Sequence, residues 1–221
     1  MKKYALIVAG GKGLRMGTEI PKQFLELNGL PVLMHTLKAF RQIEGIHLIL
    51  VLPALHFAFW KDLCARHHFD LPHQLVAGGD TRFESVKNGL SQIEDTDSLV
   101  AIHDGVRPLV SEKIIEDCYA IALQKGNGIA VVPSKDSIRK QELLNNHSVN
   151  RANYYLVQTP QCFQTKLIQA AYQTTFEDNF TDDASVLEAT GVEINMMTGD
   201  YRNIKITAQE DLIVAEALLK N

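Results

Sequence analysis

Glycines and basic residues gather in one stretch near the start of the chain, directly after an apolar run at residues 4–8. The stretch reads Ala9-Gly10-Gly11-Lys12-Gly13-Leu14-Arg15-Met16-Gly17, and Pro21-Lys22 follows shortly afterwards. Glycine lets backbone N–H groups approach an anion closely, and Lys12, Arg15 and Lys22 bring positive charge to the same loop. These residue types favour polyanion binding, with a flexible turn between two elements as the alternative interpretation.

The spacing within this loop does not match two well-known phosphate-binding motifs. A Walker A loop requires Ser or Thr after its Gly-Lys pair, whereas Gly13 follows Lys12 here. A dinucleotide fingerprint requires a third glycine where Met16 stands. It also requires an acidic residue after the second strand, where the chain has Pro53. Both of these nucleotide-binding motifs are therefore excluded.

Two charged residues follow another apolar run, at residues 99–103. Asp104 is suited to hold Mg²⁺ across a triphosphate, because a hard cation prefers carboxylate and phosphate oxygens. Its alternative role is to cap the next helix, but Ser111 already stands at the expected cap position. The Arg107 guanidinium can bind an anionic acceptor through two hydrogen bonds, and a surface ion pair is its alternative role.

A third polar cluster, Gly78-Gly79-Asp80, follows a short apolar run at residues 74–77. The Asp80 carboxylate can accept a hydrogen bond from the exocyclic amine of cytosine, a donor that uracil lacks, while Ser85 reads the base edge. Capping of the loop is an equally good interpretation of Asp80. In an open α/β sheet, ligands bind beyond the carboxyl ends of the strands, so the three loops can line one crevice.

The first loop resembles the signature of nucleotidyltransferases that join a nucleoside triphosphate to a sugar phosphate. That signature reads G-G-x-G-x-R-M followed by P-K, and the chain carries it as Gly10-Gly11-Lys12-Gly13-Leu14-Arg15-Met16 with Pro21-Lys22. From end to end, the order of motifs is similar to the family of 2-C-methyl-D-erythritol 4-phosphate cytidylyltransferases. The resemblance implies transfer of CMP from CTP to a polyol phosphate, methylerythritol phosphate, with release of pyrophosphate.

The resemblance also implies a role for each site residue. Stabilisation of the transition state is assigned to Arg15, Lys22 and Lys205, and Asp104 is assigned to Mg²⁺ or another divalent cation. The nucleotide is assigned to Ala9, Gly10, Gly11, Lys12, Gly13, Gly79, Asp80 and Ser85. The acceptor is assigned to Arg107, Thr181 and Lys205, joined by Ser137 and Arg151 from the exchanged arm of the partner subunit in a homodimer.

The chain departs from the family pattern near the predicted acceptor site. It has Asp104-Gly105-Val106-Arg107 where members often have D-A-A-R, and Ser137 where threonine is frequent. A ribitol-5-phosphate cytidylyltransferase shares most of the same motifs and is the main alternative. A hexose-phosphate nucleotidyltransferase is a second alternative. A non-catalytic CTP-binding module is a third, and it would bind CTP without turnover.

Composition limits the partners and the compartment. The chain has 221 residues and a net charge of −4, so no overall positive field attracts nucleic acid. Its three cysteines lack C-x-x-C spacing, which indicates reduced thiols in a cytoplasmic protein rather than disulfides or a zinc site. The run at residues 4–8 is too short for a signal peptide, and no stretch reaches the length of a membrane span. We therefore expect neither nucleic acid nor a membrane as a partner.

Apolar strands alternate with amphipathic helices through the first part of the chain. Strands are predicted at residues 4–8, 46–52, 74–77, 99–103 and 129–132, and helices at 32–43, 55–67, 82–93 and 112–124. A capping box of Thr81 and Glu84 marks the start of the third helix, and Ser111 caps the fourth. Repeated β-α units of this kind predict an α/β fold with a doubly wound, mostly parallel, Rossmann-like sheet.

The pattern breaks at Pro133. Residues 134–157 are polar and irregular, with a turn predicted at Asn145-Asn146-His147, and an insertion of this length is usually functional. We predict a protruding β-arm for dimerisation, inserted into a single domain that spans residues 1–221. Helices are then predicted at 167–175 and at 182–189, the latter capped by Thr181. Strands follow at 192–197 and 203–206, the second carrying Lys205, and Thr207 with Glu210 caps the last helix.

Overall fold

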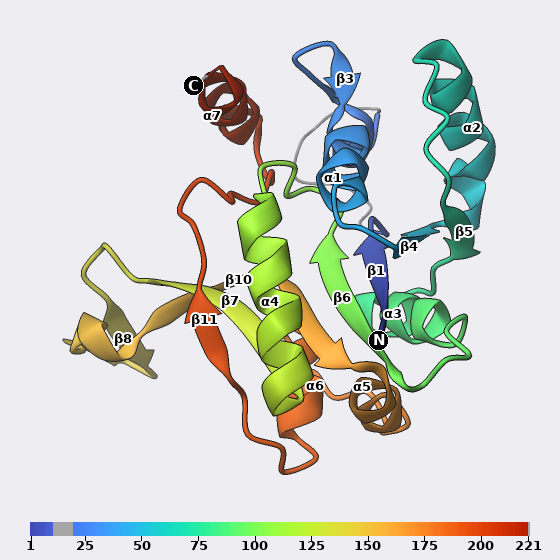
Figure 1. Ribbon diagram of the computed structural model, residues 1–221. Helices are drawn as coiled ribbons and strands as arrows, with labels where there is room; N and C mark the ends of the chain where they lie inside the picture. Colours follow the sequence, from blue (N-terminus) through green and yellow to red (C-terminus); the bar gives the residue numbers. More distant parts are fainter. Residues whose placement is uncertain (11–19, 221) are drawn as a thin grey trace.

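The computed structural model describes residues 1–10 and 20–220 and is built around one seven-stranded sheet. The strand order is β11-β7-β10-β6-β1-β4-β5 (Figure 1). The strands of this sheet are β1 (Lys2–Val8), β4 (Ile46–Leu52), β5 (Gln74–Ala77), β6 (Ser98–Asp104), β7 (Asn127–Pro133), β10 (Tyr155–Gln164) and β11 (Met196–Thr198). A separate short hairpin consists of β2 (Glu26–Leu27) and β3 (Leu30–Pro31).

Most neighbouring strands of the sheet are parallel, as the sequence predicted. β1 runs parallel to β4 and β6, β4 to β5, and β7 to β11, whereas β10 is antiparallel to both β6 and β7. β1 and β6 pair in register, with Val8 opposite Asp104, so the two strands end at the same level. The loops that leave their carboxyl ends therefore meet at one edge of the sheet.

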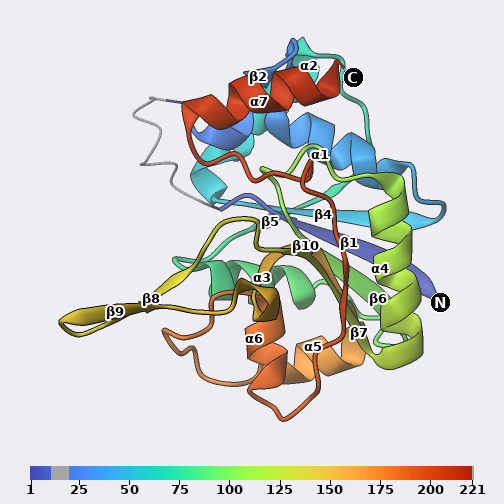
Figure 2. The same cartoon turned by 90° about the vertical axis from the view of Figure 1, so that its left-hand side faces the viewer.

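Helices cover both faces of the sheet (Figure 2). One face carries α1 (Val32–Arg41), α2 (Phe57–Arg66) and α4 (Glu112–Lys125), and the other carries α3 (Arg82–Leu90), α5 (Thr165–Ala171) and α6 (Asp183–Glu188). Alternate side chains of β1 serve the two layers, since Ile7 packs in the first and Leu6 in the second. α7 (Gln209–Leu219) packs on the β2–β3 hairpin, with Ala215 and Leu27 in one small apolar cluster. Within the described ranges, no helix is both long enough and apolar enough to cross a membrane.

The predicted arm is a hairpin that projects from the body of the molecule (Figure 2). It consists of β8 (Arg139–Glu142) and β9 (Asn145–Ser148), and every residue of both strands is exposed. The chain reverses at Leu143 and Leu144, between the paired residues Glu142 and Asn145. The turn predicted at Asn145-Asn146-His147 is therefore wrong. Both faces of this hairpin meet water, so its strands lack the apolar alternation by which a strand is recognised.

Local hydrogen bonds correct two of the predicted helix caps. Asp182, rather than Thr181, caps α6, because its carboxylate accepts from the backbone N–H of Ser185 at 2.9 Å. At α7, Asp211 takes the role predicted for Glu210 and accepts from the backbone N–H of Ala208 at 2.8 Å. In both cases two neighbouring polar residues could fill the predicted role, and the hydrogen bonds show which of them does so.

Three elements of the last third are shorter than predicted or absent. Of the strand predicted at residues 192–197, only the end belongs to β11 (Met196–Thr198), which lies at the edge of the sheet and pairs with β7 alone. The helix predicted at 167–175 ends as α5 at Ala171. Residues 203–206 form no strand, so Lys205 lies in a loop instead of the predicted strand. Apolar side chains in these segments pack onto the core from loops, which their pattern alone does not distinguish from a strand.

Candidate functional site

A cleft of about 980 Å³ opens where β1, β5 and β6 end. Three predicted loops contribute to its wall, through Gly10, through the Gly78-Gly79-Asp80 segment and through Asp104. The same cleft is lined by Lys22, Arg82, Ser85 and Lys205. The structure thus brings most of the described site residues together at the carboxyl ends of the strands, as expected for an open α/β sheet.

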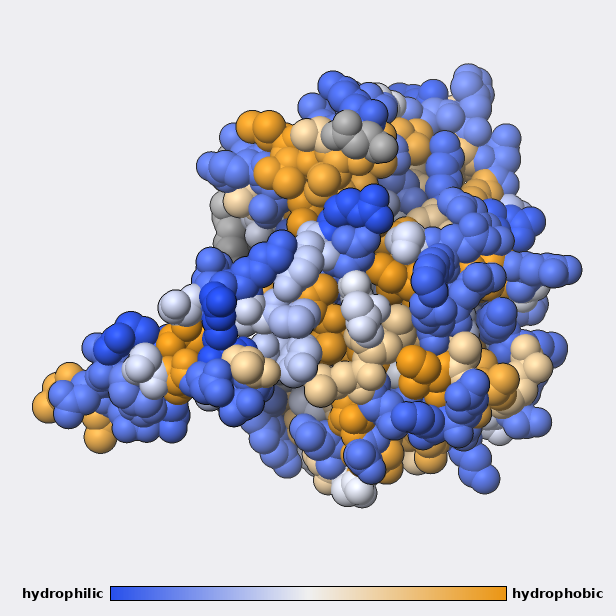
Figure 3. Space-filling view, turned by 60° about the vertical axis from the view of Figure 1, so that its left-hand side comes forward, coloured by the Kyte–Doolittle hydropathy of each residue, from blue (hydrophilic) through white to orange (hydrophobic). Residues whose placement is uncertain are grey.

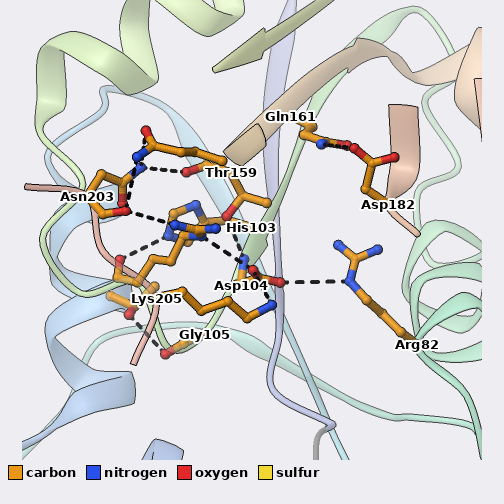
Figure 4. Close-up of polar contacts among 12 residues, drawn as sticks. Arg82, His103, Asp104, Gly105, Thr159, Gln161, Asp182, Asn203 and Lys205 are labelled. Carbon is orange, nitrogen blue, oxygen red and sulfur yellow. Dashed lines mark hydrogen bonds and ion pairs between the residues drawn. The ribbon is translucent and has the colours of Figure 1, made fainter. Parts of the chain in front are cut away.

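Asp104 lies among three cations, and we refer to Asp104, Arg82, Arg107 and Lys205 as the Asp104 cluster (Figure 4). Lys205 Nζ lies 2.9 Å and Arg107 Nε 3.4 Å from Asp104 Oδ2, while Arg82 Nε lies 3.8 Å from Oδ1. Burial by itself would raise the pKa of Asp104, but the three cations outweigh burial and hold that pKa well below its usual range. The carboxylate is therefore ionised at any physiological pH.

Buried amide side chains hold the loop that carries Lys205. Gln158 Nε2 donates to the backbone oxygen of Asp200 at 2.8 Å, and Gln158 Oε1 accepts from the Asp200 N–H at 3.2 Å. Asn203 is fully buried, and its Nδ2 donates to the backbone oxygen of Thr159 at 2.8 Å. These hydrogen bonds attach the loop to β10 at Asp200 and at Asn203, two residues before Lys205.

An irregularity in β10 makes these contacts possible. The pairing of β10 with β7 shifts between Val157 and Gln161, and this frees Gln158 and Thr159 from the ladder. Thr159 Oγ1 accepts the backbone N–H of Asp104 at 3.0 Å, where β6 ends. The segment Gln158-Thr159-Pro160-Gln161, whose pattern indicates no chemistry, therefore joins β6 to the Lys205 loop.

Ser85 is buried beneath the loop that follows β5. Its Oγ accepts from the backbone N–H of Gly79 at 3.1 Å. A Cβ at Gly78 would lie 2.8 Å from that oxygen, and one at Gly79 would lie 2.4 Å from Glu84 Cβ, so close packing requires both glycines. Asp80 is exposed and lines the cleft beside them. The Ser85 hydroxyl thus holds the loop from below, and Asp80 is the side chain that a ligand can reach.

The two ends of the first glycine loop belong to the described residues. Gln23 Nε2 donates to the backbone oxygen of Ala9 at 3.0 Å, which ties the end of β1 to the short 3₁₀ helix η2 (Lys22–Phe24). Lys22 begins this helix and lines the cleft. The predictions for Gly11, Lys12, Gly13 and Arg15 lie outside the described residues.

Four of the five predicted acceptor-binding residues are absent from the lining of the cleft in their own chain. Ser137 and Arg151 are exposed at the base of the arm, where Arg151 donates to the backbone oxygen of Lys135. Thr181 is exposed just before α6. Arg107, the fourth, lies directly behind Asp104 with its side chain 11% exposed. The acceptor residues are therefore dispersed, whereas the described nucleotide residues are gathered.

Arg82 is a site residue that sequence analysis missed. It begins α3, and its NH1 and NH2 donate to the two oxygens of the fully buried Asp183 at 2.9 and 2.7 Å. The Tyr172 hydroxyl donates to the same carboxylate at 2.6 Å. In the sequence, an arginine in the first turn of a helix looks like an ordinary surface charge. No local pattern pairs it with an aspartate that lies 101 residues away.

The donor chemistry of Asp104 fits a divalent cation. Lys205 Nζ and Arg107 Nε lie 2.9 and 3.4 Å from its Oδ2, whereas Arg82 Nε lies 3.8 Å from Oδ1, beyond hydrogen-bonding distance. One ionised oxygen suffices for Mg²⁺ when phosphate oxygens and water supply the other ligands. Within residues 1–10 and 20–220, no group of three or more His, Cys, Asp and Glu side chains is placed to hold a metal by itself. A metal at Asp104 would therefore depend on the nucleotide.

Sequence comparison connects the whole chain to one family. The family model of 2-C-methyl-D-erythritol 4-phosphate cytidylyltransferase matches residues 4–221. A protein of that name from Phocaeicola vulgatus is 49% identical over 220 residues, which cover 99% of this chain and 100% of the relative. Another from Syntrophus aciditrophicus is 41% identical over 230 residues, which cover 99% of this chain and 96% of the relative.

Solved structures agree with this result. The crystal structure of 4-diphosphocytidyl-2C-methyl-D-erythritol synthase from Anaerococcus prevotii matches with a TM-score of 0.84 at 32% identity, covering 100% of this chain and 96% of that one. The crystal structure of 2-C-methyl-D-erythritol 4-phosphate cytidylyltransferase from Thermus thermophilus has a TM-score of 0.80 at 30% identity and covers 100% of both chains. The likeness therefore includes the sheet, the cleft and the segment that forms the arm.

Proposed function

The chain belongs to the 2-C-methyl-D-erythritol 4-phosphate cytidylyltransferase family, and from that premise we propose how its cleft transfers CMP from CTP to this acceptor. It is a cytidylyltransferase, and its products are CDP-methylerythritol and pyrophosphate. The observation that carries the assignment of the site is the Asp104 cluster, which gathers three cations at the end of the sheet. Two polyanions must meet in this reaction, and concentrated positive charge lowers the cost of their approach.

The chemistry requires charge stabilisation more than proton transfer. A phosphate monoester has a second pKa near ~6, so the acceptor is largely dianionic at neutral pH and already nucleophilic. One of its oxygens attacks the α-phosphorus of CTP while the bond from that phosphorus to the β-phosphate oxygen breaks, and pyrophosphate leaves with the electron pair. We assign no general base. Lys22 and Lys205, together with Arg15, stabilise the charge that develops at the α-phosphorus.

We assign the cytosine to the loop after β5 and the phosphates to the backbone of the first glycine loop. Asp80 is an exposed carboxylate of the cleft that can accept from the cytosine amine, and its loop is held in place by Ser85. Asp80→Asn should narrow the preference for CTP over UTP, because an amide can also donate a hydrogen bond. The ratio of kcat/KM for the two nucleotides measures this preference. An unchanged ratio would leave Asp80 as a loop residue.

We propose that CTP enters with Mg²⁺ or another divalent cation, which the Asp104 carboxylate would hold. A bound metal supplies positive charge to the triphosphate oxygens. Asp104 also acts without the metal, because its ion pair with Lys205 at 2.9 Å keeps that ammonium inside the cleft. Replacement of Asp104 would therefore disturb both the nucleotide and the cation that faces it.

We propose a homodimer in which the arms are exchanged. Leu143 and Leu144 at the tip are 101% and 95% exposed, and Tyr155 and Leu156 at the base are 44% and 55% exposed. Figure 3 shows apolar surface both at the outer end of the arm and near its base. Such surface is costly in a monomer, and a closed two-fold contact would cover it on both subunits. The exchange would also bring Arg151, with Ser137 beside it, to the acceptor in the neighbouring cleft.

We propose the cytoplasm as the site of action, because the three cysteines are free thiols. Cys118 and Cys162 are buried, and burial together with Asp70 raises the pKa of the half-buried Cys64 to about 11. A thiol that stays protonated is a poor nucleophile and a poor metal ligand, as at Cys64. None of the three cysteines lines the cleft, so none is assigned a catalytic role.

A pyrophosphate-release assay tests the function directly. CTP is supplied with either 2-C-methyl-D-erythritol 4-phosphate or ribitol 5-phosphate, and kcat/KM is compared. We expect a preference of at least about tenfold for methylerythritol phosphate, the scale on which pocket contacts discriminate similar substrates. A preference for ribitol phosphate would favour the ribitol-5-phosphate cytidylyltransferase. Tight CTP binding without turnover of either acceptor would favour a non-catalytic binding module.

A further inference from the structure

Arg82 joins two parts of the molecule that are far apart in sequence. It directly follows the nucleotide loop and Thr81, whose side chain accepts from the Glu84 N–H and caps α3. Its guanidinium is paired through two hydrogen bonds with Asp183, at the start of α6. The next residue, Phe83, stacks on the Tyr172 ring at 4.7 Å, so the first turn of α3 is attached twice to the α5–α6 region.

The pair of Arg82 and Asp183 is more than a surface contact. Asp183 is fully buried, and its carboxylate accepts three hydrogen bonds, two from Arg82 and one from Tyr172. A buried ion pair loses so much hydration that its net contribution to stability is small or negative compared with an apolar replacement. Stability alone is therefore a weak reason for this network, and fixation of one geometry is the stronger one.

The Nε side of the Arg82 guanidinium faces the active site. With NH1 and NH2 committed to Asp183, Nε points toward Asp104 Oδ1 at 3.8 Å (Figure 4). On the other side of the same carboxylate, Lys205 and Arg107 engage Oδ2. Positive charges therefore face both oxygens, and the position of Arg82 is dictated by Asp183 rather than by Asp104.

We propose that Arg82 is a positioning residue that orients the Asp104 carboxylate for nucleotide transfer. Asp183 and Tyr172 hold the guanidinium, and the guanidinium, which faces Oδ1, keeps Oδ2 of Asp104 turned toward Lys205. The inference rests on the role proposed above for Asp104. Lysine cannot replace Arg82, because a single ammonium cannot span both oxygens of Asp183 and still face Asp104.

A double-mutant cycle between Arg82 and Asp104 tests the inference. The variants Arg82→Lys, Asp104→Asn and the double variant are compared with wild type in kcat/KM for CTP, and thermal melts accompany each measurement. We expect Arg82→Lys to lower kcat/KM by roughly 10- to 100-fold, the range for a lost charge-assisted hydrogen-bond network. In the Asp104→Asn background, the same change should cost less than about twofold, because residues that act as a unit are not additive. Arg66→Lys is the matched control, since Arg66 pairs with Asp62 on the exposed surface of α2.

The outcomes are distinguishable. If the losses in kcat/KM from the two single substitutions add fully in the double variant, Arg82 does not act through Asp104. A wild-type kcat/KM in Arg82→Lys would equally overturn the inference. Wild-type activity in Asp104→Asn would remove the role proposed for Asp104 and the inference with it.

Tyr172→Phe provides a mild variant, because it removes one hydrogen bond from Asp183 and leaves the ion pair. We expect a loss of about two- to fivefold in kcat/KM with little change in the melting temperature, and no loss would count against the network.

Discussion

The Asp104 cluster and the β8–β9 arm use the same residue types in opposite environments. In the cluster, the side chains of Arg107 and Asp104 are 11% and 10% exposed. In the arm, the ion pair of Lys140 and Glu142 joins side chains that are 60% and 53% exposed. Water screens the second pair, so it contributes little, whereas charges in the cluster keep their field and their geometry. The molecule thus carries a preorganised electrostatic site on its body and a solvated, extended hairpin as its arm.

The two regions also differ in whether one copy of the chain is sufficient for their roles. The cluster is complete within one chain, because buried amides of Gln158 and Asn203 fix the loop that carries Lys205. The arm makes few contacts with its own body, so its predicted role depends on a second copy of the chain. Changes in the cluster should therefore act on the chemistry, and changes in the arm should act on assembly and on the acceptor.

The largest effect is expected from the cluster. Lys205→Ala should lower kcat by roughly 10²–10³, the size found for loss of one preorganised charge. The melting temperature should change little, because the Lys205 side chain is 42% exposed. Steady-state pyrophosphate release and a thermal melt measure both quantities, with Lys140→Ala in the arm as the control. If the kcat of Lys205→Ala stays within a few-fold of the wild-type value, the Asp104 cluster would be no more important for the chemistry than the arm.

Acid should destabilise the buried region in a defined pH window. Burial lowers the pKa of His103 from 6.5 to about 4, so between these values the unfolded chain binds a proton that the folded chain does not. The free energy of unfolding should therefore be largest above about pH 6.5 and fall by on the order of 3 kcal/mol as the pH drops to about 4. The low pKa of Asp104 adds a further loss below pH 4 in the same direction.

Urea unfolding at pH 7, 5.5 and 4 measures this dependence. His103→Gln cannot take up the proton and should show a flatter profile between pH 7 and 4. Equal free energies of unfolding for the wild type at pH 7 and pH 4 would contradict a neutral, buried His103.

A smaller effect is expected from the base of the arm. Arg151→Ala should raise KM for the acceptor and lower kcat/KM by roughly 10- to 100-fold, the range for hydrogen bonds to a charged group.

Exchange of arms can be tested by co-expressing Lys22→Ala and Arg151→Ala with different tags. In a mixed dimer, one site has an intact Lys22 and receives an intact Arg151. With random pairing, roughly a quarter of all sites should recover. A purified mixed dimer without activity would overturn the exchange of arms.

The smallest effect is expected at the tip of the arm. Replacement of Leu143 and Leu144 by serine should shift the melting temperature of the monomer by less than about 1 °C, because both side chains are already in water. The buried Leu37 provides the contrast, since Leu37→Ala should cost roughly 2–5 kcal/mol. Melts over a range of protein concentrations separate folding from assembly. A large shift at the lowest concentration would show that the tip contributes to the fold of one chain.

Local patterns by themselves determined most elements of the sheet and its helices. β4 (Ile46–Leu52) and β5 (Gln74–Ala77) have the predicted bounds, and the capping residues Thr81 and Ser111 make the predicted hydrogen bonds. Continuous apolar runs and bonds between residues three positions apart depend on nearby residues only, so a single sequence contains them. The same patterns were least informative in the arm and after residue 190, where exposed strands and buried loops lack a distinctive periodicity.

Tertiary structure alone decided which charges meet. The backbone N–H of Asp104 donates to the Thr159 hydroxyl because β10 lies beside β6, and Gln161 Nε2, also on β10, donates to Asp182 Oδ2 at 2.7 Å. Arg82 donates hydrogen bonds to Asp183, which lies 101 residues further along the chain. Whether a charged side chain is solvated or buried depends on its partner, because desolvation is tolerated only where an opposite charge and hydrogen bonds replace water. That balance is set when distant strands and loops are brought together, and a local pattern does not contain it.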